Sequence, residues 1–160
     1  MTPRASIAAL LQDLDRRSPA GFAIALHIRF TTPTYLFQTY PSRWLEHYSA
    51  AGMVVHDPTV HWGLQNLGHI RWAELEAIDS GGVLEEAKDF GLMNGVAVAV
   101  VVSGSRSIGS FARADRDYDG AEMRELEALL TELHVATIGT SELSAGDQLA
   151  LTELSIKLTR

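Results

Sequence analysis

One stretch decides the fold of this 160-residue chain: Val96-Ala97-Val98-Ala99-Val100-Val101-Val102, then Ser103-Gly104-Ser105-Arg106, then Ser107–Ala114. The first segment is apolar throughout, which predicts a strand buried on both faces. The polar segment that follows is a turn, and Ser107–Ala114 is the expected partner strand. A turn this short joins two strands only as an antiparallel hairpin.

A second hairpin is predicted upstream, where apolar residues alternate with others. Five apolar side chains are expected on one face of its first strand: Phe22, Ile24, Leu26, Ile28 and Phe30. The turn is expected at Thr31-Thr32-Pro33 and the second strand at Thr34–Tyr40. Strands that come as hairpins, rather than alternating with helices, favour an antiparallel sheet.

Apolar spacing and capping residues predict helices in the rest of the chain. The first helix is expected at residues 7–14, and the second begins after a cap at Ser42. The third runs from Asp57-Pro58 to about Leu67, where Gly68 closes it, and the fourth is capped by Ser80 and stopped by Gly91. Two further helices are expected, one at Asp119–Ile138 and one from near Ser144. The long helix carries an Asp119/Glu122 capping pair. Helices around an antiparallel sheet make the expected fold class α+β.

The composition narrows the class of protein. Apolar residues make up 46% of the chain, which is typical of a compact globular domain. The absence of cysteine excludes a disulfide scaffold, a Cys-ligated metal and a Cys nucleophile. A net charge of -7 argues against a nucleic-acid surface on these residues. With no signal peptide and no apolar run of membrane length, a cytoplasmic protein without membrane contact is expected.

Motifs that carry enzymatic chemistry are missing from the sequence. It has no phosphate-binding loop, no dinucleotide fingerprint and no His-Glu-x-x-His. Gly104-Ser105-Arg106-Ser107 lacks the second glycine of a nucleophile elbow. His56, His61 and His69 lack the acidic and histidine partners of a metal site. The protein is therefore expected not to be an enzyme and to hold neither a metal nor a cofactor.

Aromatic residues with polar tips are the most informative feature. Tyr40, Trp44 and Tyr48 recur every four residues, and Trp62 and Trp72 follow. An ordinary core stripe is one interpretation. However, buried Tyr and Trp need hydrogen-bond partners, and here they accompany an aspartate. This combination favours an apolar pocket with a few convergent polar groups, which is the usual form of a small-ligand site.

Several uncommon residues agree with one known family in type, order and spacing. They are Tyr40-Pro41-x-x-Trp44-x-x-x-Tyr48, Asp57-Pro58-Thr59-Val60, Trp72, and Glu86-Ala87-x-x-Phe90-Gly91-Leu92-x-x-Gly95. Over about residues 5–138, the chain resembles the autoinducer-binding domain of LuxR-type quorum-sensing transcriptional regulators. The resemblance implies an antiparallel sheet of about five strands sandwiched between helices, within a ligand-binding domain over residues 1–140.

The resemblance also implies a non-covalent site for an N-acyl-homoserine lactone. Trp44, whose indole only donates, would bond the lactone carbonyl. Asp57 would accept from the amide N–H in a charge-assisted bond. Tyr40 would donate to the amide carbonyl. Asp57 has a second interpretation, as a helix cap, and one carboxylate oxygen could cap while the other meets the ligand.

Other residues would shape the same site. Tyr48 and Trp72 would pack on the ring and the start of the tail, and Thr59 would add a contact near the amide. On the second strand of the Val96 hairpin, the family often has a Ser or Thr where this chain has Ala112, with Ser110 on the same face. The full expected set is Tyr40, Trp44, Tyr48, Asp57, Thr59, Trp72, Phe90, Leu92, Ser110 and Ala112. Phe90 and Met93 are bulky enough to limit the acyl tail.

The C-terminal segment suggests a second domain. Leu143-Ser144-Ala145-Gly146-Asp147-x-x-Ala150-Leu151-x-x-x-Ser155 resembles the opening of the family's helix-turn-helix domain. Residues 141–160 are therefore expected to be a linker and the start of a truncated helix-turn-helix domain, or a C-terminal helix. DNA binding would need a recognition helix that this chain lacks.

These observations favour the ligand-sensing domain of a transcriptional regulator. The resemblance implies a homodimer, with the Asp119–Ile138 helix either at the interface or in the core. One alternative is a stand-alone dimerisation module that inhibits full-length regulators. A lactone or acyl hydrolase is the remaining alternative, and it lacks an identifiable nucleophile.

Overall fold

The computed structural model describes residues 6–138. Its elements in chain order are α1 Ile7–Arg16, β1 Gly21–Arg29, β2 Thr32–Gln38, α2 Ser42–Ala50, η1 Met53–His56, α3 Pro58–Gln65, β3 Gly68–Arg71, η2 Trp72–Ile78, α4 Val83–Lys88, β4 Asn94–Val102, β5 Ser105–Arg113 and α5 Gly120–Ala136. The η elements are 3₁₀ helices. The predicted helices and hairpins of this range are all present, at somewhat different boundaries.

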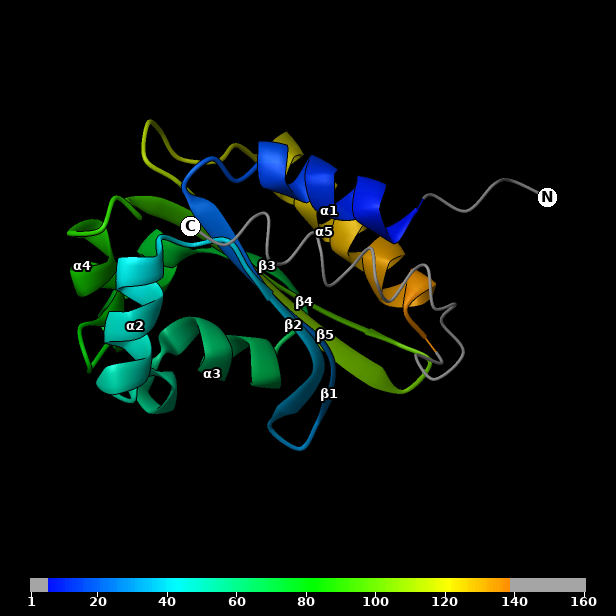
Figure 1. Ribbon diagram of the computed structural model, residues 1–160, viewed down its shortest axis with the longest axis horizontal. Helices are drawn as coiled ribbons and strands as arrows, with labels where there is room; N and C mark the ends of the chain where they lie inside the picture. Colours follow the sequence, from blue (N-terminus) through cyan, green and yellow to red (C-terminus); the bar gives the residue numbers. More distant parts are fainter. Residues whose placement is uncertain (1–5, 139–160) are drawn as a thin grey trace.

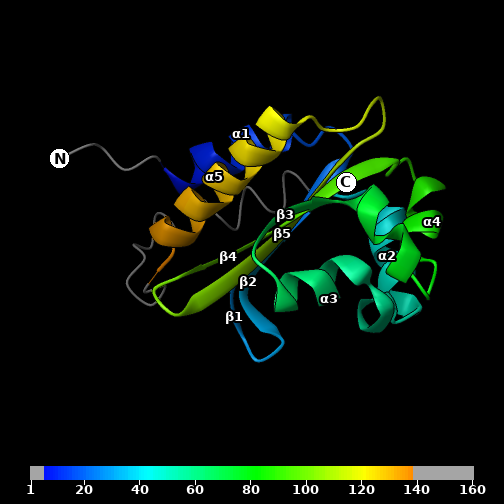
Figure 2. The same ribbon diagram turned by 180° about the vertical axis from the view of Figure 1, so that it is seen from behind.

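The sheet divides the domain into two helical layers. Its five strands are all antiparallel, in the order β2-β1-β5-β4-β3. Helices α1 and α5 lie on one face, and α2, α3 and α4 lie on the other (Figure 1; Figure 2 shows the reverse view). The predicted α+β fold, with helices on both sides of an antiparallel sheet, is confirmed.

The layer between the sheet and helices α1 and α5 is an apolar core. It is built from side chains of α1, α5 and the strands, among them Leu10, Leu11, Leu14, Phe22, Ile24, Leu26, Val96, Val98, Phe111, Leu126, Leu130 and Leu133. The apolar stripe of α5 therefore faces the core, as in the second of the two interpretations left open for this helix. Every second residue of β4 points into this layer, and the residues between point to the opposite one.

The β4–β5 hairpin turns more tightly than expected. Ser103 and Gly104 both have positive φ, 55° and 72°, and Val102 pairs directly with Ser105. Two consecutive residues with positive φ are typical of the two-residue turn that matches strand twist. The strand burial predicted for Val96–Val102 holds as far as Val100, and Val101 is exposed.

The alternation predicted for β1 is wrong beyond Leu26. Between Ala25 and Ile28, β1 contains one residue more than the facing segment of β5, which is a β-bulge. His27 occupies the bulge with φ 52°. Because an extra residue changes the side-chain direction, Phe30 does not join the face of Leu26 but is fully exposed at the hairpin end.

The first hairpin also turns earlier than predicted. Arg29 pairs with Thr32, so the turn is Phe30-Thr31 rather than Thr31-Thr32-Pro33. Pro33 lies inside β2, which is tolerated because β2 is an edge strand and Pro has no N–H to contribute.

The fifth strand, β3, was missed by the pattern analysis and matches the strand number implied by the resemblance. It has only four residues and pairs with β4. Gly68, expected to close a helix, instead begins β3 with φ 100°, and α3 ends at Gln65. Four residues are too few to show the alternation by which a strand is found.

Two predicted helix caps are wrong. Ser42 is the first residue of α2 and its side chain makes no capping bond. Ser80 does not cap α4, because Asp79 does: its two carboxylate oxygens accept from the backbone N–H groups of Val83 and Leu84, each at 2.9 Å. Aspartate accepts two such bonds at once, which a serine hydroxyl cannot do with the same geometry.

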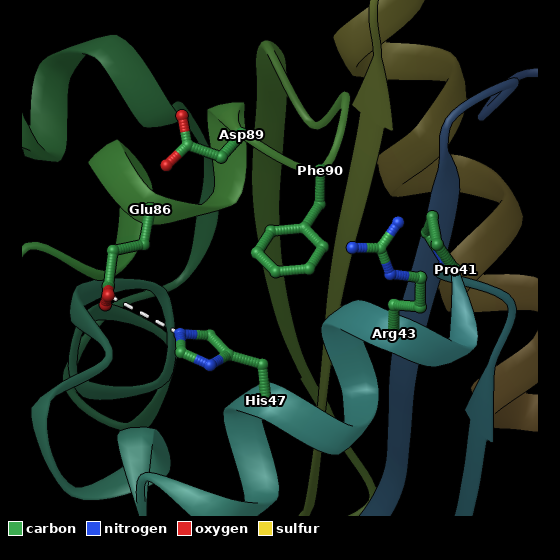
Figure 3. A pocket seen from close by; sticks show the side chains of 6 residues that line it. All are labelled: Pro41, Arg43, His47, Glu86, Asp89 and Phe90. Carbon is green, nitrogen blue, oxygen red and sulfur yellow. Dashed lines mark hydrogen bonds and ion pairs between the residues drawn. The ribbon is translucent and has the colours of Figure 1, made fainter.

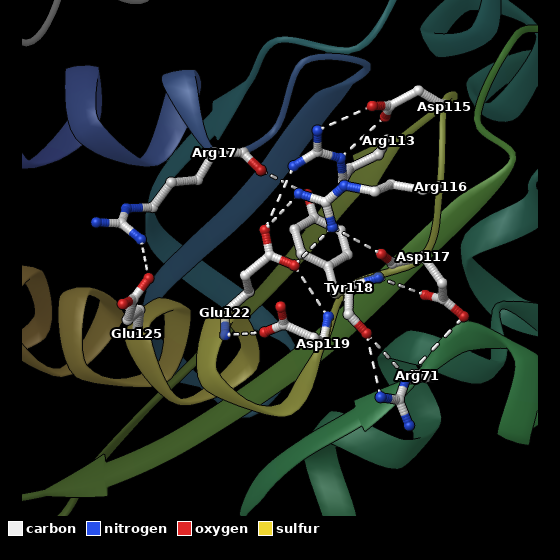
Figure 4. Close-up of polar contacts among 10 residues, drawn as sticks. All are labelled: Arg17, Arg71, Arg113, Asp115, Arg116, Asp117, Tyr118, Asp119, Glu122 and Glu125. Carbon is white, nitrogen blue, oxygen red and sulfur yellow. Dashed lines mark hydrogen bonds and ion pairs between the residues drawn. The ribbon is translucent and has the colours of Figure 1, made fainter.

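The predicted caps of α3 and α5 are confirmed. Asp57 accepts from the backbone of Thr59 at the start of α3. Asp119 and Glu122 cap α5 reciprocally, at 2.8 and 2.9 Å. Glu122 is held further by Arg116, with two bonds of 2.8 Å (Figure 4).

The loop before α5 is tied to its neighbours by polar contacts around Tyr118 (Figure 4). The Tyr118 hydroxyl donates to the carbonyl of Arg17 at 2.7 Å, and Arg17 also pairs with Glu125. The Arg71 guanidinium donates twice to the Tyr118 carbonyl, at 3.2 and 3.1 Å. These bonds join α1, β3 and α5 at one end of the sheet.

Some expectations fall outside the described residues. They are the helix from near Ser144 and the assignment of residues 141–160 to a linker and the start of a second domain, or to a C-terminal helix. Within residues 6–138, no helix is long and apolar enough to cross a membrane, and no group of three or more His, Asp or Glu could hold a metal ion.

Candidate ligand-binding site

The second core, between the sheet and helices α2 to α4, contains the expected site residues. Its buried members are Tyr40, Trp44, Met53, Trp72, Leu75, Val83, Leu84, Ala87, Leu92 and Ala112, with Tyr48, Trp62 and Phe90 packed against them. We call this set the aromatic cluster. Unlike the first core, it is rich in side chains that have a polar tip.

The sheet gives the aromatic cluster a floor of small side chains. Ser110 and Ala112 of β5 face this layer, and Ser110 pairs across the sheet with Ala23 and Ala97. Directly paired residues of neighbouring strands project on the same side. Because these side chains are short, large side chains of the covering elements can approach the sheet closely.

Gly95 shows how closely the backbone and the cluster approach. A Cβ at Gly95 would lie 2.1 Å from an atom of the Trp72 indole, far inside van der Waals contact. Gly95 thus makes the space in which the indole lies. There, the Trp72 Nε1–H donates to the Ser110 hydroxyl at 2.9 Å, and the Tyr40 hydroxyl donates to the Ser110 carbonyl at 3.1 Å.

Asp57 is the charged centre of the site. It is 8% exposed, and both its carboxylate oxygens are engaged. Oδ1 accepts from the backbone N–H and the hydroxyl of Thr59, at 2.9 and 2.7 Å. Oδ2 accepts from the Tyr48 hydroxyl at 2.7 Å. The carboxylate therefore caps α3 and also faces the aromatic cluster, so the two interpretations of this residue are compatible.

The two tyrosines beside Asp57 are held in their neutral form. Burial raises the pKa of Tyr40 well above its usual value, and the charge of Asp57 raises it further. Burial and the same carboxylate also raise the pKa of Tyr48. Both hydroxyls therefore stay protonated and act as hydrogen-bond donors throughout the physiological range.

Trp44 lies between the ring of Tyr48, on the same helix, and the ring of Phe90, in the turn after α4. Its indole centroid is 5.7 Å from that of Tyr48 on the same helix and 5.2 Å from that of Phe90. It is 4% exposed. Among residues 6–138, no group accepts a hydrogen bond from its Nε1–H. Among the polar tips of the fully buried aromatic members, those of Tyr40 and Trp72 are bonded, so the Trp44 indole is the donor that remains available in the described part of the chain.

A groove with a volume of about 490 Å³ borders the aromatic cluster on the outside. Figure 3 shows the Phe90 ring between the side chains of Arg43 and His47. Phe90 stacks on His47 with centroids 5.6 Å apart, and His47 reaches Glu86 on α4 at 3.4 Å. Phe90 is therefore a wall shared by the groove and the cluster, since its ring also contacts Trp44.

The structure brings all ten expected residues into this layer. Nine of them contribute to the aromatic cluster or bond directly to a member of it, and Thr59 is joined through Asp57. Ser110 and Ala112 both face the layer, and Ser110 is the one that hydrogen-bonds there. Met93, expected to shape the tail region, is 44% exposed and lines a smaller cleft of about 120 Å³ with Trp72 and Gly95.

Some members of the layer carry no recognisable signal in the sequence. Met53 and Leu75 are buried in it but lie in 3₁₀ helices, where the apolar spacing of an α-helix is absent. Gly95 was noted only as part of the matching motif. Its packing role leaves no local signal, because the residue it accommodates is more than twenty positions away.

The family model described as "Autoinducer binding domain" matches residues 21–137. The chain belongs to this family. This domain is that of the LuxR-type quorum-sensing regulators, so the family resemblance seen in the sequence is confirmed. The family is one of transcriptional activators and not of enzymes, which agrees with the expectation that the protein has no enzymatic activity.

Curated relatives of this autoinducer-binding domain are similar over part of their length. The transcriptional activator SolR of Ralstonia nicotianae is 34% identical over 94 residues, which cover 58% of this chain and 40% of SolR. VanR of Vibrio anguillarum is 30% identical over 93 residues, 56% of this chain and 39% of VanR. The matches therefore span 26% to 40% of the length of these curated relatives.

Solved structures share the fold of the domain. SdiA of Escherichia coli superposes with a TM-score of 0.66 at 18% identity, over 86% of this chain and 63% of SdiA. CepR2 of Burkholderia cenocepacia gives a TM-score of 0.62 at 16% identity, over 85% of each chain. At such low identity, these likenesses concern the fold alone.

Proposed function

We propose that this chain is the ligand-sensing domain of a LuxR-type transcriptional regulator, and that it binds an N-acyl-homoserine lactone without covalent chemistry. The site is the layer between the sheet and helices α2 to α4. One observation carries the proposal: a buried carboxylate and several aromatic donors converge inside an otherwise apolar cluster. Such a cluster suits a ligand that has a small polar head and an apolar tail.

The polar groups of the head match the groups of the cluster. The lactone carbonyl needs a donor, and the Trp44 indole has one available. The amide N–H needs an acceptor, and Oδ2 of Asp57 has a lone pair left beside its bond from Tyr48. The amide carbonyl would take the Tyr40 hydroxyl, which would exchange its bond to the Ser110 carbonyl for this one.

The remaining residues would define the shape of the site. Tyr48 and Trp72 would pack on the ring and the start of the tail, and Thr59 would orient the Asp57 carboxylate. Phe90 would limit the tail, because its ring separates the cluster from the groove. We place the 3-oxo position of an acyl chain, where present, near the Ser110 hydroxyl.

What relatives bind supports an acyl ligand. CepR2 is described as an N-acylhomoserine-lactone-dependent LuxR family transcription factor, and SdiA has been solved in complex with octanoyl-rac-glycerol. Both ligands join an acyl chain to a small oxygen-rich head. The complete regulator would act in the cytoplasm as a homodimer and bind DNA through a separate helix-turn-helix domain.

Ligand binding would act as a switch by stabilising the fold. A ligand that binds only the folded chain adds stability that grows with its concentration, by about 2.7 kcal/mol at one hundred times its Kd. Folding and assembly of the regulator would then depend on the ligand, with no chemical step.

The test is a thermal melt of the 160-residue chain with a series of N-acyl-homoserine lactones, combined with mass spectrometry of each ligand after incubation. Ring-opened lactones and octanoyl glycerol serve as comparison ligands. We expect a rise in Tm that depends on acyl length and an unchanged ligand mass. A hydrolysed lactone would contradict the proposal in favour of an enzyme. No rise with any lactone would contradict it in favour of a ligand-free dimerisation module.

A further inference from the structure

The bulge in β1 places a histidine on the face of the sheet opposite the proposed ligand site. His27 has φ 52°, which a residue with a Cβ seldom adopts. Leu26 already points into the core of α1 and α5, and the extra residue turns His27 toward the same side. Its ring therefore meets the C-terminal end of α5, where the described chain approaches its last residue.

His27 bonds to that end of α5. Its Nε2–H donates to the carbonyl of His134 at 3.1 Å and to the Thr137 hydroxyl at 2.9 Å. The Thr137 hydroxyl itself donates to the Leu133 carbonyl. On the other side of the ring, Nδ1 lies 2.7 Å from the Ser105 hydroxyl. A single side chain of β1 thus joins the last turn of α5 to β5.

His134 completes the arrangement from the helix. It is fully buried, and its Nε2–H donates to the Val102 carbonyl at 3.0 Å. Its Nδ1 is hydrogen-bonded to the Ser107 hydroxyl at 2.6 Å, and the oxygen of Ser107 accepts from the backbone N–H of His27. The carbonyl acceptors therefore require a proton on Nε2 of each imidazole in this network. The two rings are 4.3 Å apart.

Among residues 6–138, the surroundings of the pair offer no carboxylate to compensate a positive charge, only the carbonyls at the C-terminal end of α5. Within residues 6–138, neither imidazole has a hydrogen bond or ion pair with a carboxylate. Strands β2 and β4 contribute no charged residue, and Arg29 of β1 is exposed. Arg106 of β5 bonds the carbonyls at the end of α3 on the opposite face. In α5, Glu127 is paired with His69, and Glu132 has no bond to either ring.

We propose that His27 and His134 form an acid-sensitive clamp, which holds the last turn of α5 on the sheet and loosens when His27 takes up a proton. A charged His27 would lie half-buried and within 4.3 Å of a second imidazole. When the charged His27 ring moves away from the end of α5, it becomes hydrated and its distance from the His134 ring increases.

The direction in which the pKa of His27 is shifted determines whether low or high pH weakens the clamp. Burial, and then the neighbouring His134, lowers the pKa of His27 below its usual value, against a smaller opposing effect of the bond to the His134 carbonyl. The opened state therefore binds more protons than the closed state. The clamp is fully effective above about pH 6.5, the usual pKa of histidine, and weakens as the pH falls below it.

Hydrogen–deuterium exchange of the amides of residues 133–138 tests this in the 160-residue chain. We expect the opening equilibrium, corrected for intrinsic exchange, to rise several-fold between pH 7.5 and 5.5, with a limit of about tenfold per pH unit for one proton. His27→Asn removes the titrating group, and asparagine tolerates positive φ. Its opening should be the same at both pH values.

The matched control is His61→Gln. His61 is an exposed histidine of α3, so this variant should keep the wild-type response. An unchanged wild-type opening at pH 5.5, or a His27→Asn variant that responds as strongly as the wild type, overturns the clamp. If His27→Asn does not fold, an NMR titration of the wild-type imidazoles decides: a His27 pKa below 6.5 supports the clamp, and a value at or above 6.5 overturns it.

Discussion

The Tyr48 hydroxyl donates a hydrogen bond of 2.7 Å to Oδ2 of Asp57, and this bond joins α2 to the start of α3. Two helices that cover the same face of the sheet are thus fixed to each other through a single carboxylate. The same carboxylate caps α3 through Thr59. Any ligand that bonds to Asp57 would therefore act on the relative position of both helices.

Tyr48→Phe removes one donor from a buried carboxylate and leaves the ring in place. We expect a loss of about 1–3 kcal/mol in the free energy of unfolding, because hydrogen bonds to charged groups contribute more than neutral ones. Urea denaturation of the ligand-free chain measures it. Tyr35→Phe is the matched control, since Tyr35 lies on edge strand β2, and it should change stability little. Equal losses in both variants would contradict the assigned importance of this bond.

Gly95→Ala is expected to displace the Trp72 indole. The added Cβ would lie 2.1 Å from the ring, so the indole has to move and its bond to Ser110 is lost. We expect a destabilisation of about 1–3 kcal/mol, the usual range for overpacking. Chemical denaturation followed by tryptophan fluorescence measures both the stability and the new environment of the indole.

Gly120→Ala is the control for that substitution. A Cβ there meets only the mobile end of the Arg124 side chain at 3.3 Å, in the first turn of α5. Alanine favours helix over glycine, so we expect a neutral or slightly stabilising effect. If Gly95→Ala also left the stability unchanged, this would contradict the close approach of the β4 backbone to the Trp72 indole.

The features that could be predicted from the sequence are local, and those that could not depend on residues far apart in the chain. The caps at Asp57 and Asp119, the helix stripes and both hairpins depend on residues within a few positions of one another, and they were predicted. The β1 bulge depends on pairing with β5, about eighty residues away, so alternation alone placed Ile28 and Phe30 wrongly. Gly95 likewise depends on a distant partner.

In the candidate site, too, local features were predictable and contacts between distant residues were not. The aromatic spacing and Asp57-Pro58 predicted a set of residues that the structure brings into one layer, and the order of residues around them identified the family. The choice between Ser110 and Ala112 needed the register of β5 against its neighbours. The resemblance could place a residue on this strand but could not show which hydroxyl reaches Trp72.

An alkaline titration tests the burial of the tyrosines. Burial raises the pKa of Tyr40, Tyr48 and Tyr118 above the value of about 10 found in unfolded chains. The folded state then binds more protons than the unfolded state above pH 10, so stability falls as the pH rises through that range. Absorbance at 295 nm should show these tyrosines ionising only together with unfolding. Ionisation of all four tyrosines near pH 10 in a still folded chain would be incompatible with the structure.

Trp44→Phe removes the available indole donor and keeps an aromatic ring. We expect lactone affinity to fall about tenfold or more, because a buried carbonyl would lose its partner. Trp62→Phe, which changes a tryptophan at the edge of the same cluster, should leave the affinity within a few-fold of wild type. Calorimetric titration of both variants provides the comparison, and an unaffected Trp44→Phe would remove this residue from the site.

The most direct measurement compares Asp57→Asn with Asp79→Asn by calorimetric titration of a lactone that stabilises the wild-type chain. Both aspartates accept from backbone N–H groups at the start of a helix in the same layer, and asparagine keeps one of the two acceptor oxygens in each case. Only Asp57 faces the aromatic cluster, so its loss of charge should lower the affinity by about tenfold or more, while Asp79→Asn binds like the wild type. Wild-type affinity in Asp57→Asn, or equal losses in the two variants, would mean that Asp57 only caps α3.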